Sequence, residues 1–311
     1  MKNKERLLGM GAALVANVIF GFSFIFSKLA LTAAHPLIIL SMRFTVAFLV
    51  MCILVLSRAV RVDFRNKPRL KLILMCLAQP FAYFILELYG LSMVSSALSG
   101  VITSLVPVGV FLYSMFFTGE KPTALQGLCL ALSVGGVAAI SAFSGANGEN
   151  RLLGILLLIG AVISASAYNL LSRGASVHYS PIERTFVMFL IGAVGFNLIT
   201  LGVLRERFLP LWGEALSNPD FYLAIAYLAI LSSVGAFLLY NYATGHISAV
   251  SASSFSSVIT VVSVFAGLFI LHESFSLSDT LLCLSIVLGV FGVNYAEGKK
   301  AELLTNKNSN S

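Results

Sequence analysis

Charged residues are scarce in this sequence. They make up 11% of 311 residues, whereas hydrophobic residues make up 58%. A soluble domain usually carries about a quarter charged residues, because polar side chains must cover most of its water-facing surface. The composition therefore excludes an ordinary soluble domain and predicts an integral membrane protein.

The sequence also lacks the signatures of soluble enzymes. It contains no GxGxxG, GxxxxGK[ST] or HExxH motif and no CxxC pair, and its four cysteines all lie inside apolar runs. We therefore expect no catalysis, no cofactor and no metal site. In a membrane protein the net charge of +7 reports topology, so it does not predict a nucleic-acid partner.

What the sequence does contain is an internal duplication. Residues 6 to 36 recur 145 positions later without a gap, so that Arg6–Gly9 reappears as Arg151–Gly154. A second register, at an offset of 153, places Glu120 on Glu273, and the eight-residue difference locates one insertion in the second half. A duplicated membrane chain is typical of transporters.

Apolar windows of about 20 residues, the length that spans a bilayer, are predicted as membrane helices. Alternation typical of barrel strands is absent, so we predict an all-α membrane protein. The windows number ten, five in each half: 8–31, 36–57, 70–92, 96–117, 123–143, 152–172, 182–204, 220–243, 248–271 and 278–297.

The distribution of Lys and Arg predicts the orientation. With both termini in the cytoplasm and with Lys28 and Arg43 set aside because they lie inside predicted helices, fifteen of the twenty Lys and Arg residues lie inside and three outside, in agreement with the positive-inside rule. Five helices is an odd number, so the second repeat enters from the opposite side. We predict two inverted repeats, residues 1–148 and 149–298, around a central cavity, followed by a disordered cytoplasmic tail at 299–311.

The insertion falls between the seventh and eighth helices, at residues 205–214, and holds the single tryptophan, Trp212. Its amphipathic spacing favours a short segment lying at the membrane interface over a gating lid.

Three ionisable residues lie inside predicted membrane helices. They are Lys28, Arg43 and Glu87, and charges at such depth are costly and tend to mark transport pathways. We expect Glu87 to pair with Arg43 or Lys28 in a shared cavity. The alternative is a structural ion pair with a Lys28 side chain that reaches the interface. Arg173, the copy of Lys28, is better explained as an ordinary cytoplasmic-end arginine. Glu273, at the end of the ninth helix, is expected to cap a turn or to pair with loop cations in preference to a gating role.

Small and weakly polar residues recur at helical spacing in the ninth helix and in its copy, the fourth. Such a stripe serves close helix packing or lines a cavity, and both interpretations stay open. The first, third, sixth and eighth helices carry further uncharged hydrogen-bonding groups, which suit a neutral or zwitterionic solute. The candidate substrate-binding residues are Asn17, Phe24, Lys28, Arg43, Gln79, Glu87, Tyr168, Asn169, Ser232, Ser253 and Ser257.

The fifth and tenth helices carry glycines but no polar stripe. We predict that they are peripheral packing faces or the faces of a homodimer. The expected partners are thus a small-molecule substrate, the lipid bilayer and a second copy of the chain.

Nearly the whole chain resembles the EamA-type ten-helix exporters of the drug/metabolite transporter superfamily. The resemblance rests on residues 17–28, on Pro36 with Arg43 and Phe44, on residues 87–91, and on Ser95 through Pro107 to Glu120. It implies two inverted five-helix repeats and export of small metabolites such as amino acids. The chain departs from the family where Thr260 replaces a common proline and where Met188 stands at the repeat position of Arg43.

We therefore expect a secondary transporter, an exporter of amino-acid-like or drug-like solutes, multi-pass in the cytoplasmic membrane. It would work by alternating access, facilitated or coupled to protons. The alternatives are a membrane-embedded sensor or scaffold, and an uptake carrier for another metabolite class such as nucleosides or sugars.

Overall fold

A computed structural model describes residues 2–58, 60–65, 67–118, 123–145, 149–273, 277–278, 280–292 and 295. Every regular element among these residues is helical. The elements are α1 (Lys2–Ala33), α2 (Pro36–Leu56), α3 (Leu70–Cys76), η1 (Leu77–Ala82), α4 (Tyr83–Met93), α5 (Ser96–Thr103), α6 (Val106–Thr118), α7 (Ala124–Gly145), α8 (Glu149–Ala175), α9 (Pro181–Leu204), η2 (Arg205–Arg207), α10 (Phe208–Leu216), α11 (Pro219–Ala226), η3 (Tyr227–Gly235), α12 (Ala236–His246), α13 (Ala249–Ser254) and α14 (Ser256–Phe269).

Eight helical segments among the described residues are long and apolar enough to cross a membrane. They match the first four and the sixth to ninth predicted windows. The fifth and tenth windows correspond to shorter described apolar helices, Ala124–Ala139 and Thr280–Gly292. The predicted tail at 299–311 and Glu120 lie outside the described residues.

Some residues that recur in the two halves of the sequence have the same structural role, because their side chains cap the starts of equivalent helices. Ser95 accepts a hydrogen bond from Leu98 N at the start of α5, and its copy Ser248 does the same for α13. His35 and its counterpart Ser180 cap α2 and α9, each followed by a proline that needs no amide partner there. Burial, with a smaller contribution from the Arg207 charge, lowers the pKa of His35, so the ring is neutral and Nδ1 can accept from the backbone.

Two of the spans are irregular at equivalent depths. The third changes to a π-helical turn at η1, where Gln79 leaves helical geometry (φ −146°, ψ 117°) before Pro80. The eighth changes to π-helix at η3, the copy of η1. The break exposes the Ala78 carbonyl, which accepts a hydrogen bond of 2.7 Å from Ser164 Oγ on α8. Each irregular turn buries polar side chains in the bundle, Gln79 in η1 and Ser232 with Ser233 in η3.

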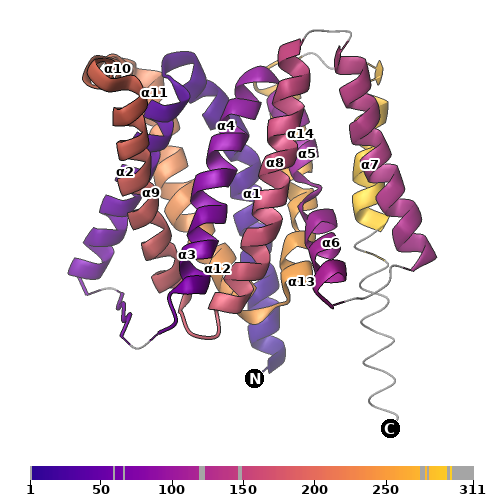
Figure 1. The fold of residues 1–311 in the computed structure, drawn as a ribbon, viewed down its shortest axis with the longest axis horizontal. Helices are drawn as coiled ribbons and strands as arrows, with labels where there is room; N and C mark the ends of the chain where they lie inside the picture. Colours follow the sequence, from indigo (N-terminus) through magenta and orange to yellow (C-terminus); the bar gives the residue numbers. More distant parts are fainter. Residues whose placement is uncertain are drawn as a thin grey trace.

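The spans form one bundle in which the two halves of the chain interleave (Figure 1). The main contacts join α4 to α8, α2 to α9, and α1 to α12 and α14. α7 stands at the edge of the bundle, where it contacts α8.

Glycines of the fifth and tenth predicted helices allow these two helices to pack closely against each other. Gly136 approaches Ser285 and Ile286, and Gly289 approaches Ser133 and the Cys129 carbonyl. The helix Thr280–Gly292 therefore packs against α7 through these faces. A dimer through the same two helices would have to use their outward apolar faces instead.

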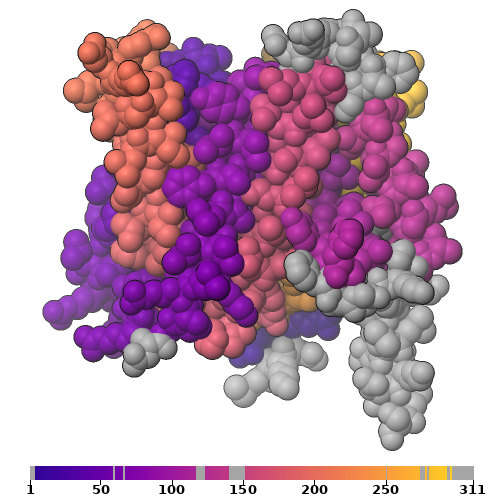
Figure 2. Space-filling model, viewed as in Figure 1, coloured from indigo at the N-terminus to yellow at the C-terminus, as the bar shows by residue number. Residues whose placement is uncertain are grey.

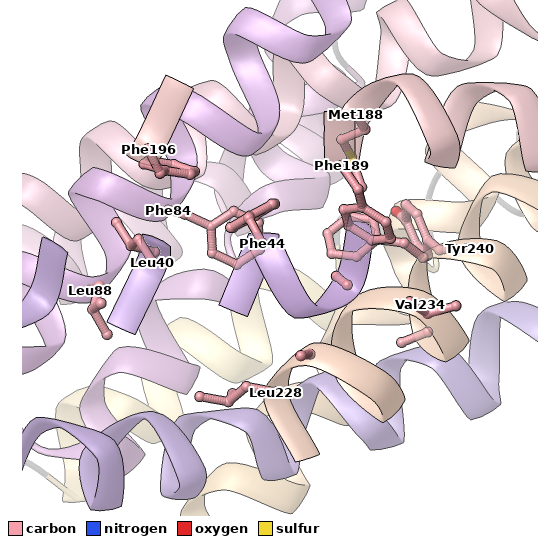
Figure 3. Packing of buried hydrophobic residues seen from close by; sticks show 14 of the residues in the cluster. Leu40, Phe44, Phe84, Leu88, Met188, Phe189, Phe196, Leu228, Val234 and Tyr240 are labelled. Carbon is pink, nitrogen blue, oxygen red and sulfur yellow. The ribbon is translucent and has the colours of Figure 1, made fainter. Parts of the chain in front are cut away.

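The centre of the bundle is aromatic (Figure 3). The Phe44 ring lies 5.1 Å from the Phe84 ring, 4.9 Å from Phe196 and 5.9 Å from Phe189. Phe189 is the copy of Phe44 at the 145-residue offset. A residue of the first half and its copy in the second half thus pack against each other in the centre of the bundle.

The inserted segment forms a helical corner, and its predicted place at the membrane interface stays a prediction. η2 leads into α10, which runs across the end of the bundle in Figure 1. The Phe208 and Trp212 rings lie 6.2 Å apart, while Leu209 points outward. This placement is typical of an interfacial amphipathic helix.

The small-residue stripes bring α5 and α14 into close contact, which predicts a sharp effect of adding one methyl group. A Cβ at Gly100 would lie 1.7 Å from Ser263 Oγ and 2.5 Å from Ser263 Cβ. We expect Gly100→Ala to lower the free energy of unfolding by about 1–3 kcal/mol, because the helices must separate. The midpoint of thermal denaturation in detergent measures this loss.

The matched control for this prediction is Gly127→Ala on α7, where no atom lies within 4 Å of the added carbon. Adding Ser263→Gly to Gly100→Ala should restore stability. Equal midpoints for the Gly100 and Gly127 variants would contradict the α5–α14 contact.

Candidate functional site

A cavity lies in the centre of the bundle, between helices from both halves of the chain. About 60 Å³ is open to the centres of water molecules, which is room for a few ordered waters at roughly 15 Å³ each. Its lining residues are Asn17, Phe20, Ser23, Phe24, Arg43, Gln79, Tyr83, Phe84, Glu87, Thr103, Val106, Ala165, Tyr168, Asn169, Phe237, Tyr240, Ser256 and Ile259.

Arg43 supplies the positive charge of this cavity. Its side chain is 3% exposed, and Nε donates to Ser233 Oγ at 2.9 Å while Nη2 donates to Ser232 Oγ at 3.0 Å. The guanidinium carbon also lies 4.4 Å from the centroid of the Phe84 ring. No carboxylate in the described part of the chain lies within 4.0 Å of it. Hydroxyl groups orient the guanidinium without neutralising it, so it is available to an anionic group of a ligand.

Glu87 supplies the negative charge. It lies on α4 and is 3% exposed, and its Oε2 atom is buried without a hydrogen-bond partner. The predicted direct ion pair with Arg43 or Lys28 is not formed, because η3 offers two hydroxyls that take up the Arg43 donors. Arg43 and Glu87 still line one cavity and interact electrostatically. A buried polar atom without a partner in the described part of the chain is costly, and the residue that carries it lines the cavity.

Lys28 does not line the cavity, contrary to its prediction as a binding residue. Its charge interacts instead with Glu273. Glu273 caps α5 from a distant part of the chain, since its carboxylate accepts from Ser96 N at 2.8 Å and from Ser96 Oγ at 2.9 Å. Glu273 therefore caps the start of another helix, α5, which differs from the predicted cap of a turn at the end of its own helix, and Lys28 interacts with that same carboxylate.

Most of the other candidates do meet at the cavity. Asn17, Phe24, Gln79, Tyr168 and Asn169 line it together with Arg43 and Glu87. The remaining candidates do not line it. Ser232 accepts a hydrogen bond from Arg43, and Ser253 and Ser257 are buried in the bundle outside the cavity.

The two open interpretations of the polar stripe each hold for part of it. Thr260 Oγ1 donates to the Gly100 carbonyl at 3.3 Å, and Ser263 fills the space beside Gly100, so these residues serve packing. Thr103 and its copy Ser256 line the cavity. Successive residues of the stripe point in different directions around the helix axis, so some of them contact the neighbouring helix and others line the cavity.

The aromatic wall of the cavity was not predicted. Phe20 contacts Phe237 with ring centroids 5.0 Å apart and Tyr240 at 6.1 Å, and Phe84 lies 6.1 Å from Phe237. In an apolar membrane helix a phenylalanine facing a cavity has the same local sequence as one facing lipid. Only the fold distinguishes the two.

A hydrogen-bond network closes the cavity at the end where α8 and α12 finish. Tyr240 OH donates to Asn169 Oδ1 at 2.5 Å, and Tyr168 OH donates to Asn241 Oδ1 at 2.9 Å. Ser172 Oγ donates to the same Asn241 oxygen at 2.9 Å. The floor of the cavity is therefore tied to a polar cluster beneath it.

Arg184 is the charged centre of this cluster, and sequence reasoning missed it. It is 0% exposed, and its Nη1 atom donates to Ser172 Oγ at 2.7 Å and to Thr244 Oγ1 at 3.0 Å, while Nη2 donates to the Asn241 carbonyl. The acceptors lie in the last turns of α8 and α12, where helix dipoles favour a cation. Met188 stands at the repeat position of Arg43, and residues four apart lie on the same face of a helix. This spacing is the signal that could have placed Arg184 on the inner face of α9.

We expect Arg184→Gln to lower the free energy of unfolding by about 3 kcal/mol, because buried oxygens on two helices lose a charged donor. Thermal denaturation in detergent measures the loss. The control is Arg173→Gln, since Arg173 is exposed and donates only to the Thr244 and Gly245 carbonyls. A control variant as unstable as Arg184→Gln would contradict the special role of the buried cation.

Comparisons with known proteins agree with these features. The sequence profile of the EamA-like transporter family matches residues 7–142 and 152–295. The chain is 34% identical over 298 residues to the uncharacterized transporter YcxC of Bacillus subtilis, covering 94% of each chain. It is 25% identical over 275 residues to the uncharacterized inner membrane transporter YedA of Escherichia coli, covering 86% of this chain and 84% of the relative. A crystal structure with 18% sequence identity matches with a TM-score of 0.63, covering 94% of this chain and 98% of that one, so the fold is shared.

Proposed function

Because the chain belongs to the EamA-like transporter family, we propose that it exports a small zwitterionic, amino-acid-like solute by alternating access. One observation carries the proposal: a single cavity holds a buried guanidinium and a buried carboxylate, and neither has an ion-pair partner among the described residues. Arg43 would bind the solute carboxylate and Glu87 its ammonium group. The aromatic wall around Phe20 and Phe237 would hold an apolar side chain.

The same carboxylate offers a route to energy coupling. Protonated Glu87 cannot attract an ammonium group, whereas ionised Glu87 can. A proton and the solute would therefore occupy the site alternately. Such competition is the requirement for exchange of solute against protons, and proton exchange would supply the driving force.

We propose that the architecture is two inverted five-helix repeats, residues 1–148 and 149–298. The family profile matches the two halves separately, and η1 and η3 are irregular at equivalent positions. In Figure 1, α1 and α8, the first long helices of the two halves, begin at opposite ends of the bundle. Inverted halves around a central site can open alternately to either side by rocking against each other.

We propose that the protein lies in the cytoplasmic membrane with both termini inside, on the basis of its Lys and Arg distribution. The Arg184 network then lies on the cytoplasmic side of the cavity. A homodimer through the outward faces of α7 and the helix Thr280–Gly292 stays a prediction.

Solute counterflow in proteoliposomes tests the function. Vesicles loaded with each of the common amino acids in turn should accumulate the same labelled compound through the reconstituted chain, but not through empty vesicles. Nucleosides and sugars serve as the comparison panel, and their counterflow in place of amino acids would overturn the proposed substrate class. Solute-dependent thermal stabilisation without counterflow of any compound would favour a sensor.

A further inference from the structure

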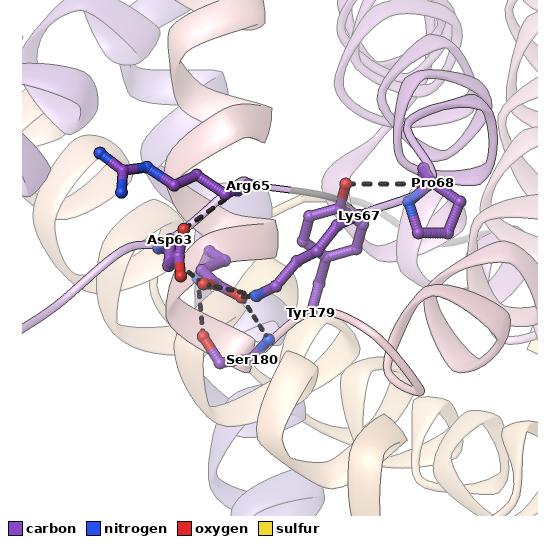
Figure 4. A network of polar contacts seen from close by, with 7 residues as sticks. Asp63, Arg65, Lys67, Pro68, Tyr179 and Ser180 are labelled. Atoms are coloured by element: carbon purple, nitrogen blue, oxygen red, sulfur yellow. Dashed lines mark hydrogen bonds and ion pairs between the residues drawn. The ribbon is translucent and has the colours of Figure 1, made fainter.

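The connection between α2 and α3 is fastened to the second half of the chain (Figure 4). We call residues 57–71 the basic strap, described except for residues 59 and 66. Glu183 Oε1 accepts from Asp63 N and from Lys67 Nζ, both at 2.8 Å, and its Oε2 atom accepts from Lys67 Nζ at 2.7 Å. Tyr179 OH adds a contact of 3.4 Å to the Pro68 carbonyl. These bonds hold the strap against the start of α9.

The fastening decides which side chains face outward. Exposure alternates along residues 61–65: Arg61, Asp63 and Arg65 are exposed, whereas Val62 and Phe64 are half-buried. Phe64 points inward, with its ring 6.3 Å from both Tyr179 and Phe186. Arg61 and Arg65 are exposed, and Figure 4 shows the Arg65 side chain directed away from the cluster.

The outward face of the basic strap has a strong excess of positive charge. Arg58, Arg61, Arg65, Arg69 and Lys71 are all exposed, and none forms an ion pair within 4.0 Å in the described part of the chain. Lys67 is excluded from this set because Glu183 neutralises it. The exposed acid among them is Asp63, whose Oδ1 accepts from the Arg65 amide. Five cations and one carboxylate leave an uncompensated positive surface.

The apolar residues next to these cations place them at the edge of a bilayer. Leu56, at the end of α2, is 80% exposed, and Leu70, at the start of α3, is 69% exposed. Both helices belong to apolar, membrane-length spans. In Figure 2 this part of the chain forms the lower left edge of the molecule. Exposed leucine directly beside exposed arginine fits the boundary between acyl chains and phosphate headgroups, and it does not fit a surface for free phosphate in water.

We propose that the basic strap is a binding site for the headgroups of anionic phospholipids. The phosphate is contacted by arginines whose positions are fixed by the Glu183 and Tyr179 contacts, and the acyl chains lie along the exposed leucines of α2 and α3. The site is separate from the central cavity and needs no transported solute. A bound lipid would tie the connection between α2 and α3 to the same membrane surface as the start of α9.

Titration of the full-length purified protein with phosphatidylglycerol or phosphatidylcholine, read by native mass spectrometry, tests the proposal. We expect the intact chain to bind phosphatidylglycerol more tightly than phosphatidylcholine. The double variant Arg61→Gln with Arg65→Gln should weaken phosphatidylglycerol binding about tenfold or more, since each cation near the headgroups contributes to attraction. Arg61→Lys with Arg65→Lys should retain most of the binding, because the charges remain.

The matched control removes two exposed arginines from another membrane edge, Arg205→Gln with Arg207→Gln, and should change binding less than about twofold. Thermal denaturation of each variant verifies that it is folded. Equal loss in the control, equal affinity for the two lipids, or displacement of the lipid by inorganic phosphate would overturn the site. Because lipid binding is measured without transport, the result is independent of the proposed export activity.

Discussion

Arg43→Gln is expected to raise the KM for a transported amino acid by about ten- to a hundredfold in proteoliposome counterflow. A hydrogen bond from a charged group contributes about 1.5–3 kcal/mol, and each 1.4 kcal/mol corresponds to a factor of ten. Arg43 is oriented by Ser232 and Ser233 toward the cavity, so its loss removes the binding partner of a solute carboxylate. The glutamine retains hydrogen-bonding capacity but not charge.

Analogues of the solute make this prediction specific. The methyl ester of the same amino acid has no carboxylate, so its transport should be nearly the same with and without Arg43. Arg43→Lys should give an intermediate KM, because it keeps the charge and loses the planar fork. Arg205→Gln, an exposed arginine outside the cavity, is the control. Equal loss of ester and free acid transport would mean that Arg43 only supports the fold.

The fold was largely predictable because membrane insertion leaves a strong record in sequence. Apolar length specified most of the spans, and the internal repeat alone aligned Ser95 with Ser248, which cap equivalent helices. Polar residues inside apolar helices are few, so Asn17, Gln79 and Asn169 stand out in the sequence, and these three line the cavity. Hydrogen-bonding groups in a membrane must find partners or water, which is why depth and polarity together were informative.

The pairing of charges was not predictable, because it depends on rotation and side-chain conformation. Window boundaries are uncertain by a few residues, which is enough to turn a helix by half a revolution. Lys28 was one of two predicted partners of Glu87, but the rotation of α1 brings Lys28 near Glu273. Arg184 is one of the fifteen cations that the positive-inside rule places on the cytoplasmic side, and α9 turns it into the bundle. Charge counting gives the side of the membrane and not the direction of a side chain.

Glu87→Gln is expected to separate binding from energy coupling. The variant is a permanent mimic of the protonated carboxyl group, so it should raise the KM for an amino acid about tenfold or more through loss of the ammonium contact. At saturating solute, counterflow should persist, because exchange of one solute molecule for another needs no proton. Accumulation driven by an imposed pH gradient should be lost, since no proton can then compete with the solute at this site.

The N-acetyl derivative of the same amino acid distinguishes this explanation from a structural defect. It carries no ammonium group, so its transport should be the same in the original chain and in the variant. Glu206→Gln is the matched control, because Glu206 is exposed in η2, before α10, and does not line the cavity. If Glu87→Gln kept pH-driven accumulation, the coupling role of Glu87 would be wrong. If it also kept the original KM for the free amino acid, the unpartnered Oε2 atom would not be a ligand for the solute, and Arg43 alone would have to supply the charge recognition.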